Sequence, residues 1–146
     1  EFNVYWDPHA AHVVFSSGAP LTMMPLDVTH RARTNRERIA AVHAIGTPVA
    51  VAAASMMASH GKRDEDDRDK DGGPLHDPCV IAYLLQPNLF RGRTCNVRVE
   101  TGSELTMGMT VVDWWGVTDR PKNCTVMNRI DADGYFALIA DRLRRL

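Results

Sequence analysis

The segment "GGPLHDPCVIAYLL", residues 72–85, decides how this chain is interpreted. Asp77 stands where a helix N-cap is expected, and Pro78 stands at the first helical position. The residues that follow are apolar on nearly every side of such a helix, which predicts that the helix is buried. Asp77 can therefore be a simple cap. Alternatively, it can supply an oxygen to a hard cation at the helix start, beside the titratable His76.

The charged run before this segment has two interpretations. Residues 62–71 are all charged, with six acids and four bases. Because such a run cannot bury apolar area, a mobile surface loop is expected over residues 61–73. Within it, "DRDKDG" at residues 67–72 resembles the opening of an EF-hand calcium loop. Pro78 then occupies the twelfth position, where that loop needs a bidentate Glu, so a solvated loop is favoured and the calcium loop remains an alternative.

The composition is that of an ordinary globular chain. Its 146 residues suffice for one domain with a buried core, and they are 45% hydrophobic and 24% charged. A net charge of −1 argues against a nucleic-acid partner, and no apolar stretch approaches the roughly 18 residues that span a membrane. Three widely separated cysteines favour a reducing compartment, taken as the cytoplasm. Because Glu1 is not Met, we expect the chain to begin part-way through a longer protein.

Caps and hydrophobic periodicity predict a mixed α/β fold. The expected helices before the charged run are residues 7–18, with Asp7 as the N-cap, 34–45 and 48–60. A short buried strand leading into a loop is expected at residues 19–29. The expected late strands are residues 93–101, 109–115 and 123–131. An amphipathic helix closes the chain at residues 131–146, with acids at its start and arginines at its end.

Two local patterns add detail. The spacing of Thr34 and Glu37 predicts a capping box at the start of the second helix. The first three residues, "EFN", carry a carboxylate and an amide on alternate positions. In an extended strand end, Glu1 and Asn3 would point to the same side, where they could bind a pair of sugar hydroxyls.

Five motifs occur in one order along the chain: "EFNVYWDPHAA", "LDVTHRA", "GGPLHDP", "NVRVET" and "GMTVVD". Their order and spacing resemble the carboxy-terminal half of the inosine–uridine-type nucleoside hydrolases, over the whole length from Glu1 to Leu146. The resemblance implies part of an open, mainly parallel α/β sheet flanked by helices, with a few late strands and a C-terminal helix. It also implies that residues 1–146 form a single segment of one domain.

The resemblance implies a chemistry and a set of site residues. The family hydrolyses the N-glycosidic bond of ribonucleosides to ribose and base and uses a bound Ca²⁺. By resemblance, Asp77 is a Ca²⁺ ligand and His76 helps to protonate the leaving base. Glu1 and Asn3 bind ribose hydroxyls, and Phe2 lines the sugar pocket. Such groups suit the reaction, because carboxylates stabilise a cationic sugar and a proton donor assists a poor leaving group. The preferred base, purine or pyrimidine, stays open.

The sequence departs from the family in one respect. The aspartate-rich motif that supplies most Ca²⁺ ligands and the water-activating base has no counterpart between Glu1 and Asn35. Because Ca²⁺ takes about six to eight oxygens, Asp77 alone cannot hold it well. The leading hypothesis is therefore a hydrolase segment that is inactive without a missing N-terminal half. The alternative is a non-catalytic, self-associating fragment or interaction module, because a missing half would expose a sheet edge and an apolar face.

Overall fold

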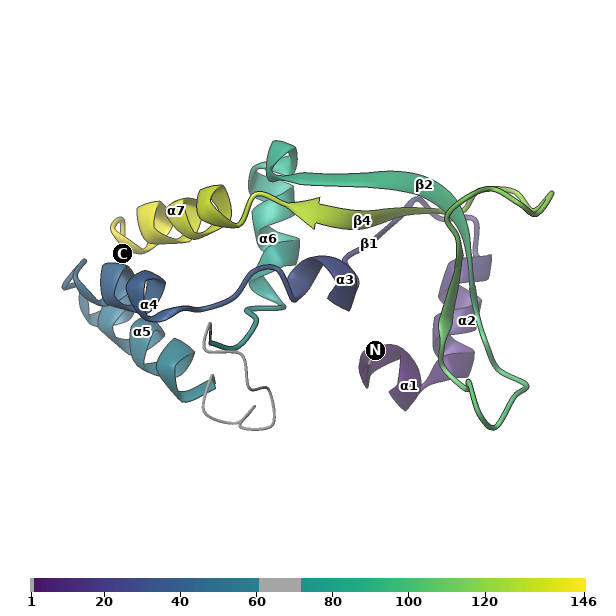
Figure 1. Ribbon diagram of the computed structural model, residues 1–146, viewed down its shortest axis with the longest axis horizontal. Helices are drawn as coiled ribbons and strands as arrows, with labels where there is room; N and C mark the ends of the chain where they lie inside the picture. The colour runs from purple at the N-terminus through teal and green to yellow at the C-terminus, as the bar shows by residue number, and fades with distance from the viewer. Residues whose placement is uncertain (1, 61–71) are drawn as a thin grey trace. The chain divides into compact units, whose positions relative to one another are not determined.

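The computed structural model describes residues 2–60 and 72–146, and Figure 1 shows the order of their helices and strands. The chain divides into two compact units, of which the first comprises Glu1–Pro25 and Gly92–Asn128 and the second Leu26–Arg91 and Arg129–Leu146. The charged run that was expected to form a surface loop lies outside the described residues. The expectation that residues 1–146 form a single segment stays a prediction.

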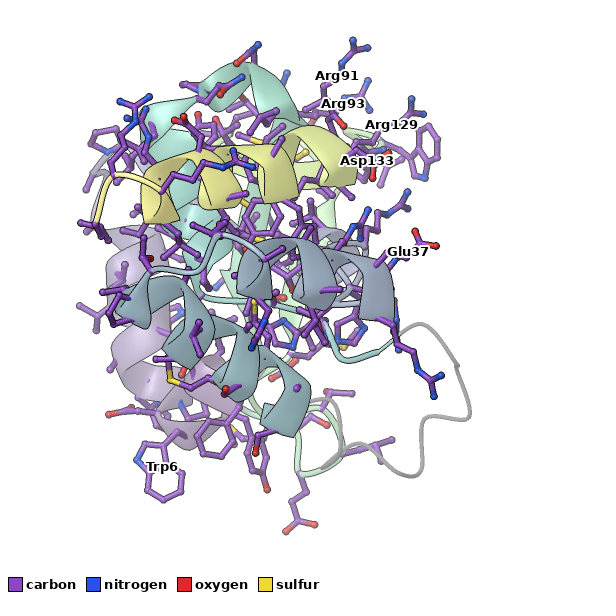
Figure 2. The ribbon with its side chains drawn as sticks, turned by 90° about the vertical axis from the view of Figure 1, so that its left-hand side faces the viewer. Trp6, Glu37, Arg91, Arg93, Arg129 and Asp133 are labelled. Atoms are coloured by element: carbon purple, nitrogen blue, oxygen red, sulfur yellow. The ribbon has the colours of Figure 1, made fainter. Side chains whose placement is uncertain are left out.

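Two short helices open the first unit: α1, Phe2–Trp6, and α2, Pro8–Ser16. The predicted cap of α2 is confirmed, since Asp7 Oδ1 accepts a 2.8 Å hydrogen bond from the N–H of Ala10. Helix α1 is a correction, because an extended strand end was expected at "EFN". Asn3 therefore lies on a helix and not on a strand end, whereas Glu1 lies outside the described residues, so the predicted alignment of Glu1 with Asn3 stays untested. Trp6 is 77% exposed and points into solvent (Figure 2).

The sheet has the strand order β1-β4-β2-β3. The strands are β1, Leu21–Met23; β2, Phe90–Val99; β3, Thr110–Asp113; and β4, Cys124–Ile130. β1 and β4 pair in parallel, whereas β2 and β3 pair antiparallel. The sheet is therefore mixed, which corrects the expectation of a mainly parallel sheet. The connection between β2 and β3 is only residues 100–109, too short for the crossover that a parallel neighbour requires.

The two faces of the sheet in the first unit differ in character. One face carries the core, formed by the buried residues Cys95, Val97, Cys124 and Val126 with Phe15, Leu21, Met23, Val112 and Trp114 packed against them. The other face is polar: Thr22 lies opposite Thr125 in the register, and the Thr125 and Thr94 hydroxyls are 3.3 Å apart. This alternation is the period of two that a half-buried strand shows, and it explains why the β-forming pattern was readable in the sequence.

The second unit is helical. It contains α3, Leu26–Thr29; α4, Arg36–His43; α5, Pro48–His60; α6, Pro78–Leu85; a short 3₁₀ helix, Pro87–Leu89; and α7, Ala132–Leu143. Helix α4 packs against α5, and α7 contacts α4, α5 and α6. Helix α3 occupies residues that were expected to be a loop. No helix within the described residues is long and apolar enough to cross a membrane.

The start of α4 corrects the predicted capping box. Asn35, not Thr34, is the N-cap, and its side-chain oxygen accepts from the N–H of Arg38 at 2.8 Å. Thr34 is buried and donates its hydroxyl to the carbonyl of Gly73 at 2.9 Å. The capping residue therefore lies one position later than the sequence pattern suggested, because a tertiary contact takes the Thr34 hydroxyl.

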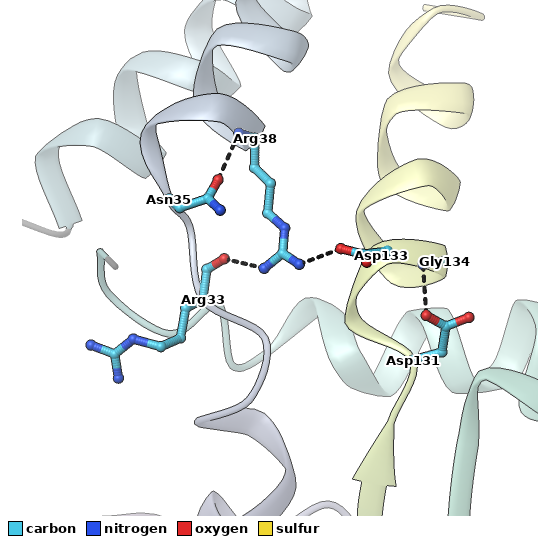
Figure 3. Close-up of polar contacts among 6 residues, drawn as sticks. All are labelled: Arg33, Asn35, Arg38, Asp131, Asp133 and Gly134. Atoms are coloured by element: carbon cyan, nitrogen blue, oxygen red, sulfur yellow. Dashed lines mark hydrogen bonds and ion pairs between the residues drawn. The ribbon is translucent and has the colours of Figure 1, made fainter. Parts of the chain in front are cut away.

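Arg38 connects α4 with α7 (Figure 3). Its guanidinium donates to the carbonyl of Arg33 at 2.7 Å and to Asp133 Oδ1 at 2.6 Å. It also lies 4.4 Å from the centre of the Phe136 ring, within the range of a cation–π contact. Beside it, Asp131 caps α7 by accepting from the N–H of Gly134 at 3.0 Å.

Helix α6 is only partly buried, which corrects the expectation of a buried helix. Cys79 and Ala82 are buried. The described residues leave a large part of its apolar surface exposed, namely Val80, Ile81, Leu84 and Leu85, with exposed fractions of 48%, 58%, 70% and 53%. A helix that is apolar all round needs neighbours on every side, and the described residues supply neighbours on one side. We call these four residues the α6 apolar face.

Candidate functional site

Residues 72–77 lead into α6 and are fixed along residues 32–34. The carbonyl of Gly73 accepts from both the N–H and the hydroxyl of Thr34, at 2.8 and 2.9 Å. The N–H of Leu75 donates to the carbonyl of Ala32 at 2.8 Å. This pairing defines the backbone position of the residues just before His76.

Gly72 has a structural reason to be glycine. Its φ is +77°, a left-handed conformation that side-chain-bearing residues rarely adopt. A Cβ at this position would also collide with the backbone carbonyl of Thr34. This glycine allows the segment to approach residues 32–34 closely.

His76 is half-buried and has a specific partner. Its Nδ1 lies 2.7 Å from the hydroxyl of Thr29, the last residue of α3. Thr29 is itself buried, with 3% of its surface exposed. The ring of His30 lies next to that of His76, with centroids 5.3 Å apart and planes tilted by 53°. The imidazole of His76 is therefore held in a defined orientation by α3.

Asp77 does not serve as a side-chain cap. Its backbone is helical, with φ −61° and ψ −39°, and its carboxylate makes no capping hydrogen bond to α6. The residue is exposed. An N-cap usually has an extended backbone and accepts from the N–H two or three residues on. The simple capping interpretation of Asp77 is therefore wrong.

The ribose-binding residues implied by the resemblance lie in the first unit. Phe2 and Asn3 are exposed on α1, and Glu1 lies outside the described residues. His76 and Asp77 belong to the second unit. The structure thus brings His76 together with Asp77, Thr29 and His30. That Glu1, Phe2 and Asn3 share a site with them stays a prediction.

The described residues do not make a complete calcium site. Within residues 2–60 and 72–146, no cluster of three or more His, Cys, Asp or Glu side chains could hold a metal ion. Asp77 contributes one carboxylate, whereas Ca²⁺ takes about six to eight oxygens. The EF-hand-like alternative at residues 67–72 lies outside the described residues except for Gly72.

Two buried hydrogen-bond donors contact the backbone carbonyl of Leu75, the residue before His76. The hydroxyl of Tyr135 on α7 donates to the carbonyl of Leu75 at 3.2 Å, and the thiol of Cys79 donates to the same oxygen at 3.3 Å. Burial raises the pKa of Tyr135, and burial also raises the pKa of Cys79. Both groups therefore stay protonated and able to donate near neutral pH.

The sequence analysis missed Thr29 and Tyr135. They lie 47 residues from His76 and 60 residues from Leu75 along the chain, so no local spacing connects them with the site. The signal for Thr29 was its place in "LDVTHRA", one of the five motifs of the resemblance. Tyr135 lies in a helix whose pattern indicated only an amphipathic element.

Comparison with known sequences identifies relatives over the whole chain. Residues 1–137 match the family described as inosine-uridine preferring nucleoside hydrolase. An uncharacterized protein of Schizosaccharomyces pombe is 46% identical over 146 residues, which are 100% of this chain and 47% of that protein. The pyrimidine-specific ribonucleoside hydrolase RihA of Shewanella sp. (strain ANA-3) is 47% identical over 144 residues, which are 98% of this chain and 45% of that protein. The chain spans about half the length of these relatives.

Solved structures show the same fold. The purine-preferring ribonucleoside hydrolase from Gardnerella vaginalis aligns with a TM-score of 0.83 and 28% identity, covering 98% of this chain and 45% of that chain. A plant nucleoside hydrolase, the PpNRh1 enzyme, aligns with a TM-score of 0.84 and 21% identity, covering 99% and 47%. Together with the match over residues 1–137, these comparisons show that the chain belongs to the inosine–uridine preferring nucleoside hydrolase family.

Proposed function

We propose that this chain is a segment of a ribonucleoside hydrolase that cleaves the N-glycosidic bond to give ribose and a free base. The observation that carries the proposal is the His76–Asp77 pair at the start of α6. Thr29 orients the imidazole, and the carboxylate is not used as a helix cap. Family membership supplies the substrate class. The activity is proposed to need a second half that supplies further aspartates.

Each residue has a proposed role. A base leaves poorly as an anion, so proton donation by His76 would contribute about 10²–10⁴ to the rate. The hydrogen bond between Thr29 and His76 reduces the rotational freedom of that ring before substrate binds. Glu1 and Asn3 would bind the ribose hydroxyls, with Phe2 against the sugar.

Asp77 is proposed as one ligand of a Ca²⁺ ion. The described residues do not supply the other oxygens of that ion. We therefore expect the isolated chain to bind Ca²⁺ weakly and to release no base from nucleosides.

A second candidate function rests on the α6 apolar face. This face exposes four apolar side chains to water, which is energetically unfavourable, and such faces promote association. The alternative is therefore a non-catalytic module of the same fold that self-associates through this face. It predicts a defined oligomer that is inactive toward nucleosides.

A chimera tests the enzymatic proposal. The part of the Shewanella RihA that matches this chain would be replaced by residues 1–146, and base release from uridine, cytidine and inosine would be followed with added Ca²⁺. RihA is named pyrimidine-specific and the Gardnerella enzyme purine-preferring, so both classes of nucleoside are needed. The isolated chain, with and without Ca²⁺, serves as the parallel sample.

The expected results separate the two candidates. In the chimera, His76→Ala should lower kcat by roughly 10²–10⁴, and Asp77→Ala should abolish activity and weaken Ca²⁺ binding. The matched control is His43→Ala, which changes an exposed histidine on α4. A folded chimera that is inactive would favour the non-catalytic module. A chimera whose activity is unchanged by His76→Ala would refute the assigned role of that residue.

A further inference from the structure

The carbonyl oxygen of Leu75 is held by two buried donors. Tyr135 of α7 and Cys79 of α6 both have 0% of their surface exposed. The Tyr135 hydroxyl is 3.2 Å from this oxygen and the Cys79 thiol is 3.3 Å from it. Two donors from different helices on one carbonyl fix that oxygen in two directions.

This carbonyl belongs to the peptide that joins Leu75 to His76. The peptide group is planar, so fixing the Leu75 oxygen also fixes the amide nitrogen of His76 and restricts its Cα. On its other side, the N–H of Leu75 donates to Ala32 at 2.8 Å. Two hydrogen bonds therefore restrain the backbone next to His76: one from Tyr135 of α7 to the Leu75 carbonyl, and one from the Leu75 N–H to the Ala32 carbonyl.

The side chain of His76 is restrained separately. Thr29 contacts its Nδ1 at 2.7 Å. The position of the imidazole relative to Thr29 depends on the backbone at His76, which the Leu75 carbonyl helps to place. Tyr135 is thereby connected to His76 through one peptide group.

Packing alone does not require the Tyr135 hydroxyl. A phenylalanine would fill nearly the same volume and keep the edge-on contact with Phe136, whose ring centroid is 5.0 Å away. A buried hydroxyl must find a partner or lose stability. Here the partner is the carbonyl next to the proposed proton donor.

We propose that Tyr135 is a positioning residue: through the Leu75 carbonyl it sets the orientation of His76. An effect of Tyr135 on catalysis rests on the proposed function of His76, whereas its effect on the orientation of the His76 ring does not. The experiment therefore begins with a readout that needs no substrate. The whole chain is used, with the variants Tyr135→Phe and Cys79→Ala and the control Tyr83→Phe. Tyr83 lies on α6 and stacks edge-on against Phe90.

The first readout is the ring signals of the histidines in ¹H–¹³C correlation spectra, with His76 assigned by His76→Gln. Tyr135→Phe should shift the His76 ring signals by more than their linewidth and leave those of His43 unchanged. The Leu75 amide should exchange about threefold to tenfold faster, the effect of losing one neighbouring hydrogen bond. Cys79→Ala should shift the His76 signals in a smaller amount, and Tyr83→Phe should not shift them.

Two results would overturn the proposal. The first is unmoved His76 signals in Tyr135→Phe, even if that variant is less stable to heat. The second is an equal shift in the Tyr83→Phe control. If Tyr135→Phe does not fold, unmoved His76 signals in Cys79→Ala would overturn the proposal, because that variant removes the other donor to the Leu75 carbonyl and tests whether this carbonyl sets the ring. In the active chimera, Tyr135→Phe should lower kcat about threefold to tenfold with KM unchanged. An inactive parent chimera would count against the proposed function only, since the spectra would still decide the positioning.

Discussion

Replacing Gly72 by alanine tests the packing that places the candidate site. Gly72 has φ +77°, and an added Cβ would collide with the carbonyl oxygen of Thr34 and lie 2.7 Å from its carbonyl carbon. Gly46 provides a matched control in the same unit, because its φ is +78° and a Cβ there would meet nothing within 4 Å. Alanine at both positions has the same unfavourable φ, so their difference isolates the collision.

The expected magnitudes follow from these contacts. The left-handed conformation costs an alanine about 1–2 kcal/mol, which is the whole expected loss for Gly46→Ala. At Gly72 the collision is with backbone, so it is relieved only if residues 72–73 move away from Thr34. That movement breaks the two hydrogen bonds between Thr34 and Gly73, each worth about 1 kcal/mol. Gly72→Ala should therefore cost about 3–4 kcal/mol in total.

Urea denaturation followed by circular dichroism measures both variants. Hydrogen exchange at the amides of Thr34 and Leu75 detects a segment that detaches locally without unfolding the whole unit. The predicted collision at Gly72 is contradicted if the two alanine variants lose the same stability within about 0.5 kcal/mol, half of one hydrogen bond, and these amides exchange equally slowly in both.

Three other perturbations test separate parts of the chain. Arg38→Ala should lower the free energy of unfolding by about 2 kcal/mol, because a charged donor and a cation–π contact are lost. Asp133→Asn should lower it by under about 0.5 kcal/mol, since the Asp133 side chain is 95% exposed. Urea denaturation compares the two variants, and equal losses would contradict the larger contribution expected of Arg38. Hydrogen bonds, first from the Thr118 side chain, lower the pKa of Asp113 to about 2. The Asp113 carboxylate should therefore stabilise the turn at residues 113–118 fully above the ordinary pKa of 3.8, and this stabilisation should disappear as pH falls through about 2. An NMR titration that gives Asp113 a pKa near 3.8 would contradict this. The double variant Ile81→Lys/Leu84→Lys should reduce self-association of the isolated chain in gel filtration, and an unchanged elution volume would exclude the α6 apolar face as the contact.

The sequence predicted the elements that local interactions determine. Asp7 caps its helix as expected, because a side chain three residues from a backbone N–H can reach it whatever the tertiary fold. Helix α5 has the expected bounds, Pro48–His60. The late strands were readable because one face of the sheet is apolar and the other polar, which leaves an alternation in the sequence.

Other predictions failed where a distant contact decides. Thr34 has the spacing of a cap, but its hydroxyl bonds to Gly73, which lies 39 residues away. The apolar pattern of α6 predicted burial, yet the neighbours within the described residues cover one side only. The sheet is mixed because the β2–β3 connection is short, whereas the family resemblance had implied a mainly parallel sheet.

The family, the Asp7 cap and the segment that carries His76 and Asp77 could be predicted from the sequence. These depend on residue types at fixed short spacings, which a reader of the sequence can count. Tertiary contacts were needed to establish that Asp77 is not a side-chain cap, that Thr29 orients the imidazole and that Tyr135 holds the preceding carbonyl. Hydrogen bonds are short and directional, so a partner dozens of residues away leaves no periodic trace in the sequence. Such a partner is determined when helices α3, α6 and α7 pack in three dimensions.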